Sequence, residues 1–201
     1  MRCAFCNEPA WYRCSLTGAY VCPPHARVQV VALNAKREPE PSSVRAAGEQ
    51  DYARLQELAL RFWGETEVEC LDREYDVLKL PAFVGLKNDD VVGFVSYAVE
   101  GDRMNLLMLN VAPKHQGRGL GSTVLAKAVI EAHKLGLSRV VVAASNDDVW
   151  ALYFYQRSGF VIEQVAPGRI AEHHGGLEKG FAGIPVRDEI RMQLALDGAP
   201  L

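Results

Sequence analysis

Gln116-Gly117-Arg118-Gly119-Leu120-Gly121 is the stretch that decides the fold, because it is rich in glycine and joins a predicted strand to a predicted helix. The strand is predicted to end at Val111, and helical periodicity runs from Gly119 to Leu135. Glycine has no Cβ, so backbone N–H groups can converge on an anion, and the start of a helix adds a favourable dipole. We predict that the loop binds a pyrophosphate; the alternative is a tight turn without a ligand.

The segments around this loop predict a mixed sheet with helices packed on it. Compact turns at 87–90 and 100–103 favour an antiparallel meander, whereas the β-branched run that follows the helix indicates a parallel crossover. Residues 168–183, rich in Gly and His, have no period and are predicted to be a long functional or mobile loop. Strands are predicted at 44–47, 80–86, 91–99, 105–111, 139–144, 160–165 and 189–196, and helices at 51–63, 119–135 and 150–157.

Composition limits the class of protein. The 201 residues are 49% hydrophobic and 23% charged, which is enough for a buried core. A net charge of -3 argues against general binding to polyanions. No apolar run approaches the roughly 20 residues of a spanning helix, and no signal peptide is evident, so we predict a cytoplasmic protein without a membrane partner. The predicted units are a Cys-rich module (1–28), a Pro-rich linker (29–43) and a main domain (44–201).

Two other nucleotide sites are disfavoured. The loop lacks the Lys-Ser/Thr ending of a Walker P-loop, and its strand follows an antiparallel meander, unlike the first strand of a dinucleotide fold. The stretch 111–121, Val-Ala-Pro-Lys-His-Gln-Gly-Arg-Gly-Leu-Gly, resembles motif A of the GNAT acetyltransferase superfamily. Asn146-Asp147-Asp148 and 151–160, Ala-Leu-Tyr-Phe-Tyr-Gln-Arg-Ser-Gly-Phe, resemble its motif B.

The resemblance covers about residues 44–196 and implies an α/β (α+β) fold, with a mixed, mostly antiparallel sheet flanked by helices. It implies that the pantetheine arm of acetyl-CoA lies between two diverging strands, where Val111 or a neighbour polarises the thioester carbonyl. It also implies contact between Asn146 and the pantetheine. The implied cofactor-binding set is Leu109, Asn110, Val111, Gln116, Gly117, Arg118, Gly119, Leu120, Gly121, Ser122, Asn146 and Tyr155.

Tyr155 is the predicted catalytic residue. Direct transfer to an amine needs a proton donor for the departing thiolate, and Tyr155, four residues before Gly159, stands where the family commonly has its general acid. A phenol with a pKa of about 10 is protonated at neutral pH. The alternative is a hydroxyl that only binds CoA. The general base stays open between water and the carboxylates Glu67, Glu69, Glu100, Asp188 and Glu189.

Segments 62–65, 80–84 and 183–190 are similar to a prokaryotic GNAT subgroup of unassigned substrate, and we predict that they shape the acceptor pocket. The alternative is a core aromatic at Trp63 and an ordinary strand entry at Pro185. His173 and His174 are interpreted as exposed residues, not metal ligands.

Cys3 with Cys6, and Cys22 with His25, form two pairs with the spacing of a tetrahedral zinc site. The arrangement resembles small treble-clef or B-box-like fingers, so we predict a structural Zn²⁺ in an N-terminal zinc finger. Cys14 is a spare candidate ligand, and Cys70 is predicted to be a small buried residue.

Two functions are consistent with this sequence. The first is an acetyl-CoA-dependent N-acetyltransferase that acts on an amine-bearing acceptor. The second is a non-catalytic acyl-CoA sensor that its zinc finger tethers to RNA or protein. Residues 1–41 carry a surplus of positive charge and aromatic side chains, which fits weak RNA contact, protein docking or a stabilising lid. Edge strands of such sheets can pair, so both a monomer and a homodimer are expected forms.

Overall fold

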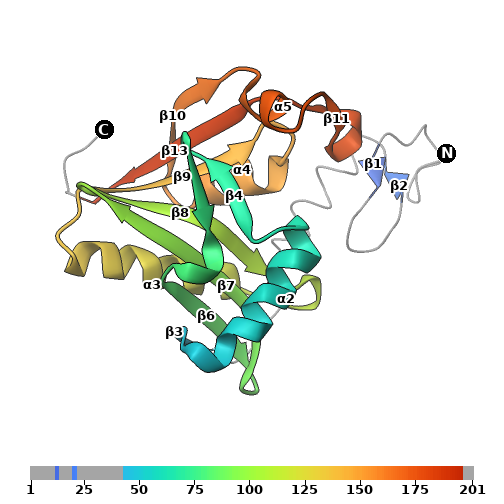
Figure 1. Ribbon diagram of the computed structural model, residues 1–201. Coiled ribbons are helices and arrows are strands. Elements are labelled where there is room, and N and C mark those ends of the chain that lie inside the picture. The colour runs from blue at the N-terminus through green and yellow to red at the C-terminus, as the bar shows by residue number, and fades with distance from the viewer. Residues whose placement is uncertain (1–11, 14–19, 22–42, 197–201) are drawn as a thin grey trace.

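The computed structural model describes residues 12–13, 20–21 and 43–196 of the chain (Figure 1). Strands β1 (Tyr12–Arg13) and β2 (Tyr20–Val21) pair antiparallel in a sheet of their own. None of the described helices is long and apolar enough to cross a membrane. The predicted zinc ligands lie outside the described residues, as does the spare cysteine; these are Cys3, Cys6, Cys14, Cys22 and His25.

Seven strands form the central sheet of the described chain. They are β3 (Ser43–Ala46), β6 (Ala82–Lys87), β7 (Asp90–Glu100), β8 (Arg103–Val111), β9 (Arg139–Ser145), β10 (Val161–Ala166) and β13 (Glu189–Ala195). Their order is β10-β13-β9-β8-β7-β6-β3, and every neighbouring pair is antiparallel except β8 with β9. The predicted antiparallel meander and the parallel crossover are both confirmed.

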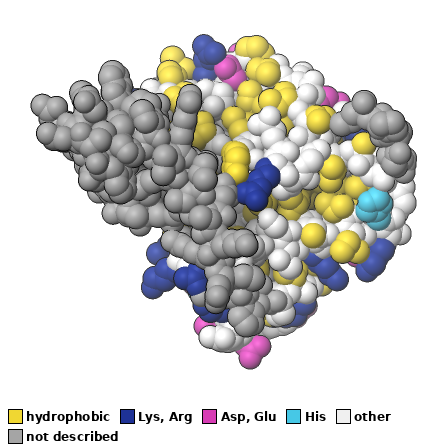
Figure 2. All heavy atoms as spheres, turned by 180° about the vertical axis from the view of Figure 1, so that it is seen from behind, with side chains coloured by type: hydrophobic (Ala, Val, Ile, Leu, Met, Phe, Trp, Pro, Cys, Tyr) yellow, Lys and Arg dark blue, Asp and Glu magenta, His cyan; other side chains and the backbone are white. Residues whose placement is uncertain are grey.

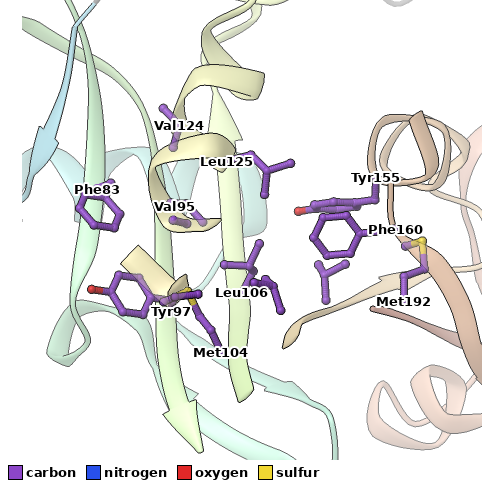
Figure 3. Packing of buried hydrophobic residues seen from close by; sticks show 14 of the residues in the cluster. Phe83, Val95, Tyr97, Met104, Leu106, Val124, Leu125, Tyr155, Phe160 and Met192 are labelled. Carbon is purple, nitrogen blue, oxygen red and sulfur yellow. The ribbon is translucent and has the colours of Figure 1, made fainter. Parts of the chain in front are cut away.

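Helices cover both faces of this sheet (Figure 1). The α-helices are α2 (Tyr52–Trp63), α3 (Leu120–Lys134), α4 (Val149–Arg157) and α5 (Arg169–His173), and the short 3₁₀ helices are η1 (Glu49–Asp51), η2 (Val77–Lys79), η3 (Pro113–His115) and η4 (Phe181–Gly183). Helix α2 packs on one face, in an apolar cluster that holds Leu58 and Phe94. Helices α3 and α4 pack on the opposite face, where Val124 and Tyr155 share a second cluster (Figure 3).

The sheet divides between β8 and β9. Their parallel pairing runs from Arg103 with Arg139 only as far as Leu106 with Val142. Directly beyond it the register of β8 on β7 shifts and leaves Leu107 as an extra residue, which is a β-bulge. From there β8 pairs with β7, and the end of β9 pairs with β13. The two strands therefore splay apart at the carboxyl end of β8, next to the glycine-rich loop.

The structure adds elements that the periodicity did not predict. Strands β4 (Glu67–Cys70) and β5 (Arg73–Asp76) form a hairpin on the α2 face, and β11 (Glu178–Lys179) pairs with β12 (Pro185–Val186). The β4–β5 turn consists of Leu71 and Asp72 with φ values of 53° and 64°, so it lacks the glycine that usually marks such a turn. Residues 168–183, predicted to have no regular structure, contain α5, β11 and η4.

Candidate functional site

The glycine-rich loop reaches α3 through two residues in the left-handed region, Gly117 at φ 73° and Gly119 at φ 92°. Gly119 occupies the N-cap position of α3 and has no side chain that could cap the helix. The main-chain N–H groups of the first turn are therefore available for an anion, which the helix dipole also favours. The geometry supports the predicted anion-binding loop.

Gly85 of β6 sets the position of this helix start. A Cβ built on Gly85 would lie 2.8 Å from Leu120 Cδ1 and 3.0 Å from Val124 Cγ2. Any other residue at position 85 would therefore require the side chains of Leu120 and Val124 to shift. Seen from the α3 side, the surface carries scattered Lys and Arg side chains, with Asp and Glu mostly near its rim (Figure 2).

The splayed end of β8 presents main-chain groups to the opening. Ala112 N–H donates to Val92 O over 2.8 Å, and the antiparallel register pairs Asn110 with Phe94. Because hydrogen bonding alternates along such a ladder, the main chain of Asn110 faces β7, and that of Leu109 and Val111 faces the opening. Two of the three predicted pantetheine partners thus have suitable main-chain groups, and Asn110 can contribute only its side chain.

Gln116 contacts this opening through its side chain. Its Nε2 donates to Val111 O over 2.8 Å, which agrees with a carbonyl that faces the opening. The side-chain amide of Gln116 therefore bonds to the same carbonyl that an amide N–H of a bound pantetheine would use. This contact was not predicted, because the motif identified Gln116 only by its main chain.

Asn146, directly after β9, is held by the segment before β13. Its Oδ1 accepts from Arg187 N–H and Asp188 N–H, each over 2.8 Å, and its Nδ2 donates to Pro185 O over 3.0 Å. These bonds join β9 to β13 at the opening. The structure therefore gives Asn146 a structural task, and its contact with the pantetheine stays a prediction.

Tyr155 lies in α4 and is 6% exposed. Its ring makes edge contacts with Phe154 and Phe160, at centroid distances of 5.2 and 5.3 Å. The hydroxyl points away from Met192, toward Leu125 and Leu106, across the line where β8 and β9 separate (Figure 3). Burial, with a smaller contribution from Asp148, raises the pKa of Tyr155 above its usual value, so the phenol stays protonated at neutral pH.

Most carboxylates considered as a general base are bonded to other groups. Asp188 accepts from Arg187 and from Gly168 N–H, and the bond with Arg187 lowers the pKa of Asp188. Glu100 accepts from the Tyr75 hydroxyl. Such bonds stabilise the charged carboxylate and weaken it as a proton acceptor. Glu69 bonds to Arg169 and His173, and Glu189 bonds to Arg191 and Leu71 N–H.

Arg191 of β13 ties the β4–β5 hairpin to the sheet. Its guanidinium bonds both carboxylate oxygens of Asp72 over 2.8 Å and donates from Nε to Glu189 over 2.5 Å. Its side chain is 13% exposed and that of Glu189 is 4% exposed. Together with the bond between Arg169 and Glu69, this arrangement holds the hairpin and residues 168–187 next to each other, beside the opening. No local pattern predicts it, because these residues lie far apart in the chain.

The sequence also led to predictions about Cys70 and about the adjacent histidines His173 and His174. Cys70 is partly buried, and burial raises its thiol pKa to about 12, so it remains a protonated, packed residue as predicted. His173 and His174 are both partly exposed. Within residues 12–13, 20–21 and 43–196, no group of His, Cys, Asp and Glu could hold a metal ion.

Comparison with known proteins identifies a family match that includes the glycine-rich loop and Tyr155. Residues 52–160 match the family described as "Acetyltransferase (GNAT) family", which is more than half of the chain. The protein YxbD of Bacillus subtilis is 25% identical over 107 residues, a match that spans 52% of this chain and 65% of YxbD. The chain therefore spans slightly less than two thirds of that relative.

Solved structures share the fold. An "IAA acetyltransferase from Bacillus cereus" aligns with a TM-score of 0.65 and 22% identity, and covers 78% of this chain and 100% of its own. A GNAT acetyltransferase from Elizabethkingia anophelis, solved with acetyl-CoA bound, aligns with a TM-score of 0.60 and 17% identity, covering 78% and 99%. These likenesses concern the arrangement of sheet and helices.

Proposed function

The chain belongs to the GNAT acetyltransferase family, and from that premise we propose that it transfers the acetyl group of acetyl-CoA directly to an amine. The observation that carries the proposal is the opening between β8 and β9, which lies next to the glycine-rich loop. A loop that binds a pyrophosphate and an opening that exposes strand amides suit the two ends of one extended donor. The Elizabethkingia relative, whose structure contains acetyl-CoA, supports this choice of donor.

We propose that main-chain N–H groups from Gly117 to Gly121, with Ser122, hold the pyrophosphate, and that Leu109 and Val111 pair with the pantetheine. The main-chain N–H of Gln116 already donates to Pro113 O. Either N–H of this stretch of β8 would polarise the thioester carbonyl. Tyr155 then donates its phenolic proton to the departing thiolate, while the neutral amine forms the new C–N bond. The amine loses its proton to water, since most candidate carboxylates are engaged elsewhere.

Acetyl-CoA titration calorimetry and thiol release over a panel of amines test this function. We expect saturable binding and thiol release that depends on the amine. Gly119→Val should weaken acetyl-CoA binding by about tenfold or more, because a β-branched residue at φ 92° distorts the loop at a cost of roughly 1–2 kcal/mol.

Gly136→Val is the matched control, because Gly136 has φ 70° directly after the other end of α3. It should strain the chain similarly and leave acetyl-CoA affinity unchanged. Binding without thiol release for any amine would favour the acyl-CoA sensor over the enzyme. Absence of binding would refute both functions.

We also propose that Cys3, Cys6, Cys22 and His25 hold one structural zinc ion. The support is the paired spacing of the four ligands in the sequence. Elemental analysis of the purified protein should find about one zinc per chain, and Cys3→Ser or Cys22→Ser should abolish it. Cys14→Ser is the control and should retain the metal; equal loss from Cys14→Ser would overturn this ligand set.

A further inference from the structure

Trp63 connects the end of α2 to the splayed part of β8. Its indole Nε1–H donates to Asn110 Oδ1 over 3.0 Å, between residues 47 positions apart. The side chain is not a core aromatic, because 46% of Trp63 is exposed. The interpretation of Trp63 as a core aromatic is therefore wrong, and its part in an acceptor pocket stays a prediction.

This hydrogen bond fixes the orientation of the Asn110 amide. An indole N–H can only donate, so the atom of Asn110 that faces Trp63 must be the oxygen. The other amide atom is then the nitrogen Nδ2, and this buried atom has no hydrogen-bond partner in the part of the chain that the structure describes. A buried donor without an acceptor is unfavourable, and an oxygen of a ligand would satisfy it.

The glycine-rich loop and the pair formed by Trp63 and Asn110 lie toward opposite faces of the sheet. The glycine-rich loop leads into α3 on one face, whereas Trp63 ends α2 on the opposite face. A donor whose pyrophosphate lies at the start of α3 therefore enters the opening from the α3 side. With the donor placed in this way, the amine would approach the thioester from the α2 side, where the side chains of Trp63 and Asn110 meet.

We propose that Asn110 and Trp63 recognise the acceptor, and that the acceptor is an amine with a carbonyl or carboxylate oxygen on the neighbouring carbon. Asn110 Nδ2 donates to that oxygen, and Trp63 is a positioning residue that holds the amide and offers its exposed ring to the rest of the acceptor. The oxygen must be close to the amine, because Asn110 stands between Leu109 and Val111, whose main chain borders the thioester. An α-amino acid or a peptide N-terminus has this chemistry. The inference rests on the proposed transferase function.

The test compares two amines that differ in this oxygen-bearing group, L-phenylalaninamide and phenethylamine. The carboxamide also lowers the pKa of the neighbouring amine, so kcat/KM is expressed per neutral amine for both substrates. On that basis we expect the wild-type kcat/KM to be at least about tenfold higher for the amide. Asn110→Leu should abolish that preference, mainly by raising KM for L-phenylalaninamide. Trp63→Phe keeps a ring but removes the N–H donor, so it should reduce the preference in part. Both variants should bind acetyl-CoA within about twofold of the wild type.

Tyr52→Phe is the control, because it removes one polar group from another exposed aromatic residue of α2. It should change neither the preference for the amide over phenethylamine nor the affinity for acetyl-CoA. Free L-phenylalanine is a third substrate; turnover of both oxygen-bearing acceptors, or of the amide alone, supports the proposal. Equal wild-type rates on the amide and phenethylamine would overturn it while leaving the transferase function intact. Weaker acetyl-CoA binding by Trp63→Phe would also overturn it, by assigning the pair to the donor. If the wild type acetylates no amine, the transferase function itself fails, and this inference with it.

Discussion

Replacement of Tyr155 by phenylalanine is expected to lower kcat by about 10²-fold or more, because the thiolate would leave without a proton donor. Phenylalanine fills the same space between Phe154 and Phe160, so the fold and the affinity for acetyl-CoA should stay close to those of the wild type. Stopped-flow measurement of thiol release at saturating substrates, together with calorimetric titration, checks both expectations.

Tyr153→Phe is the matched control on the same helix, since Tyr153 is 39% exposed. It should leave kcat unchanged. Because burial raises the pKa of Tyr155, the wild-type rate should show no loss from deprotonation of this phenol up to about pH 10. A Tyr155→Phe protein with normal kcat but weakened acetyl-CoA binding would reduce the residue to a binding role.

Replacement of Arg191 by alanine is expected to lower the free energy of unfolding by about 3 kcal/mol. The change leaves the carboxylate of Glu189, whose side chain is 4% exposed, without its cationic partner inside the protein. It also removes the two bonds that hold Asp72 and, with it, the β4–β5 hairpin. Urea denaturation followed by circular dichroism measures the difference.

Lys134→Ala provides the comparison, because exposed Lys134 and half-buried Glu131 form a pair over 3.6 Å. Its loss should cost less than about 0.5 kcal/mol. Adding Glu189→Gln to Arg191→Ala should recover part of the stability, since a neutral amide is easier to bury than a charge. A double variant as unstable as Arg191→Ala alone would show that the buried charge is not the cause.

The central sheet and α2 to α4 could be predicted because each element has its own local signal. The run 139–144 contains three consecutive valines, Val140 to Val142, and glycines flank α3 at both ends, so strand, helix and crossover followed from short windows of sequence. The β4–β5 hairpin has no such signal. Its turn uses Leu71 and Asp72, and its support comes from Arg191, 119 positions away from Asp72.

The candidate site likewise has one part that a local sequence signal predicts and another part that has no such signal. The glycine-rich loop is one contiguous motif, so its place between β8 and α3 could be predicted, whereas its binding of a pyrophosphate stays a prediction. Trp63 and Asn110 lie on different elements and meet only because α2 crosses the end of β8, which periodicity does not encode. The extra residue Leu107, where the sheet divides, also has no sequence signal, because a bulge depends on the register of the neighbouring strand.

The short seam between β8 and β9 has a thermodynamic consequence. Four residue pairs join the strands, and beyond Leu106 the described chain places no strand against the side of β8 that faces β9. A ligand with amide groups that lies in the opening would act as an additional strand and complete the ladder. Binding of this ligand would then also hold the two halves of the sheet together. The free energy of unfolding would therefore rise as the donor site fills.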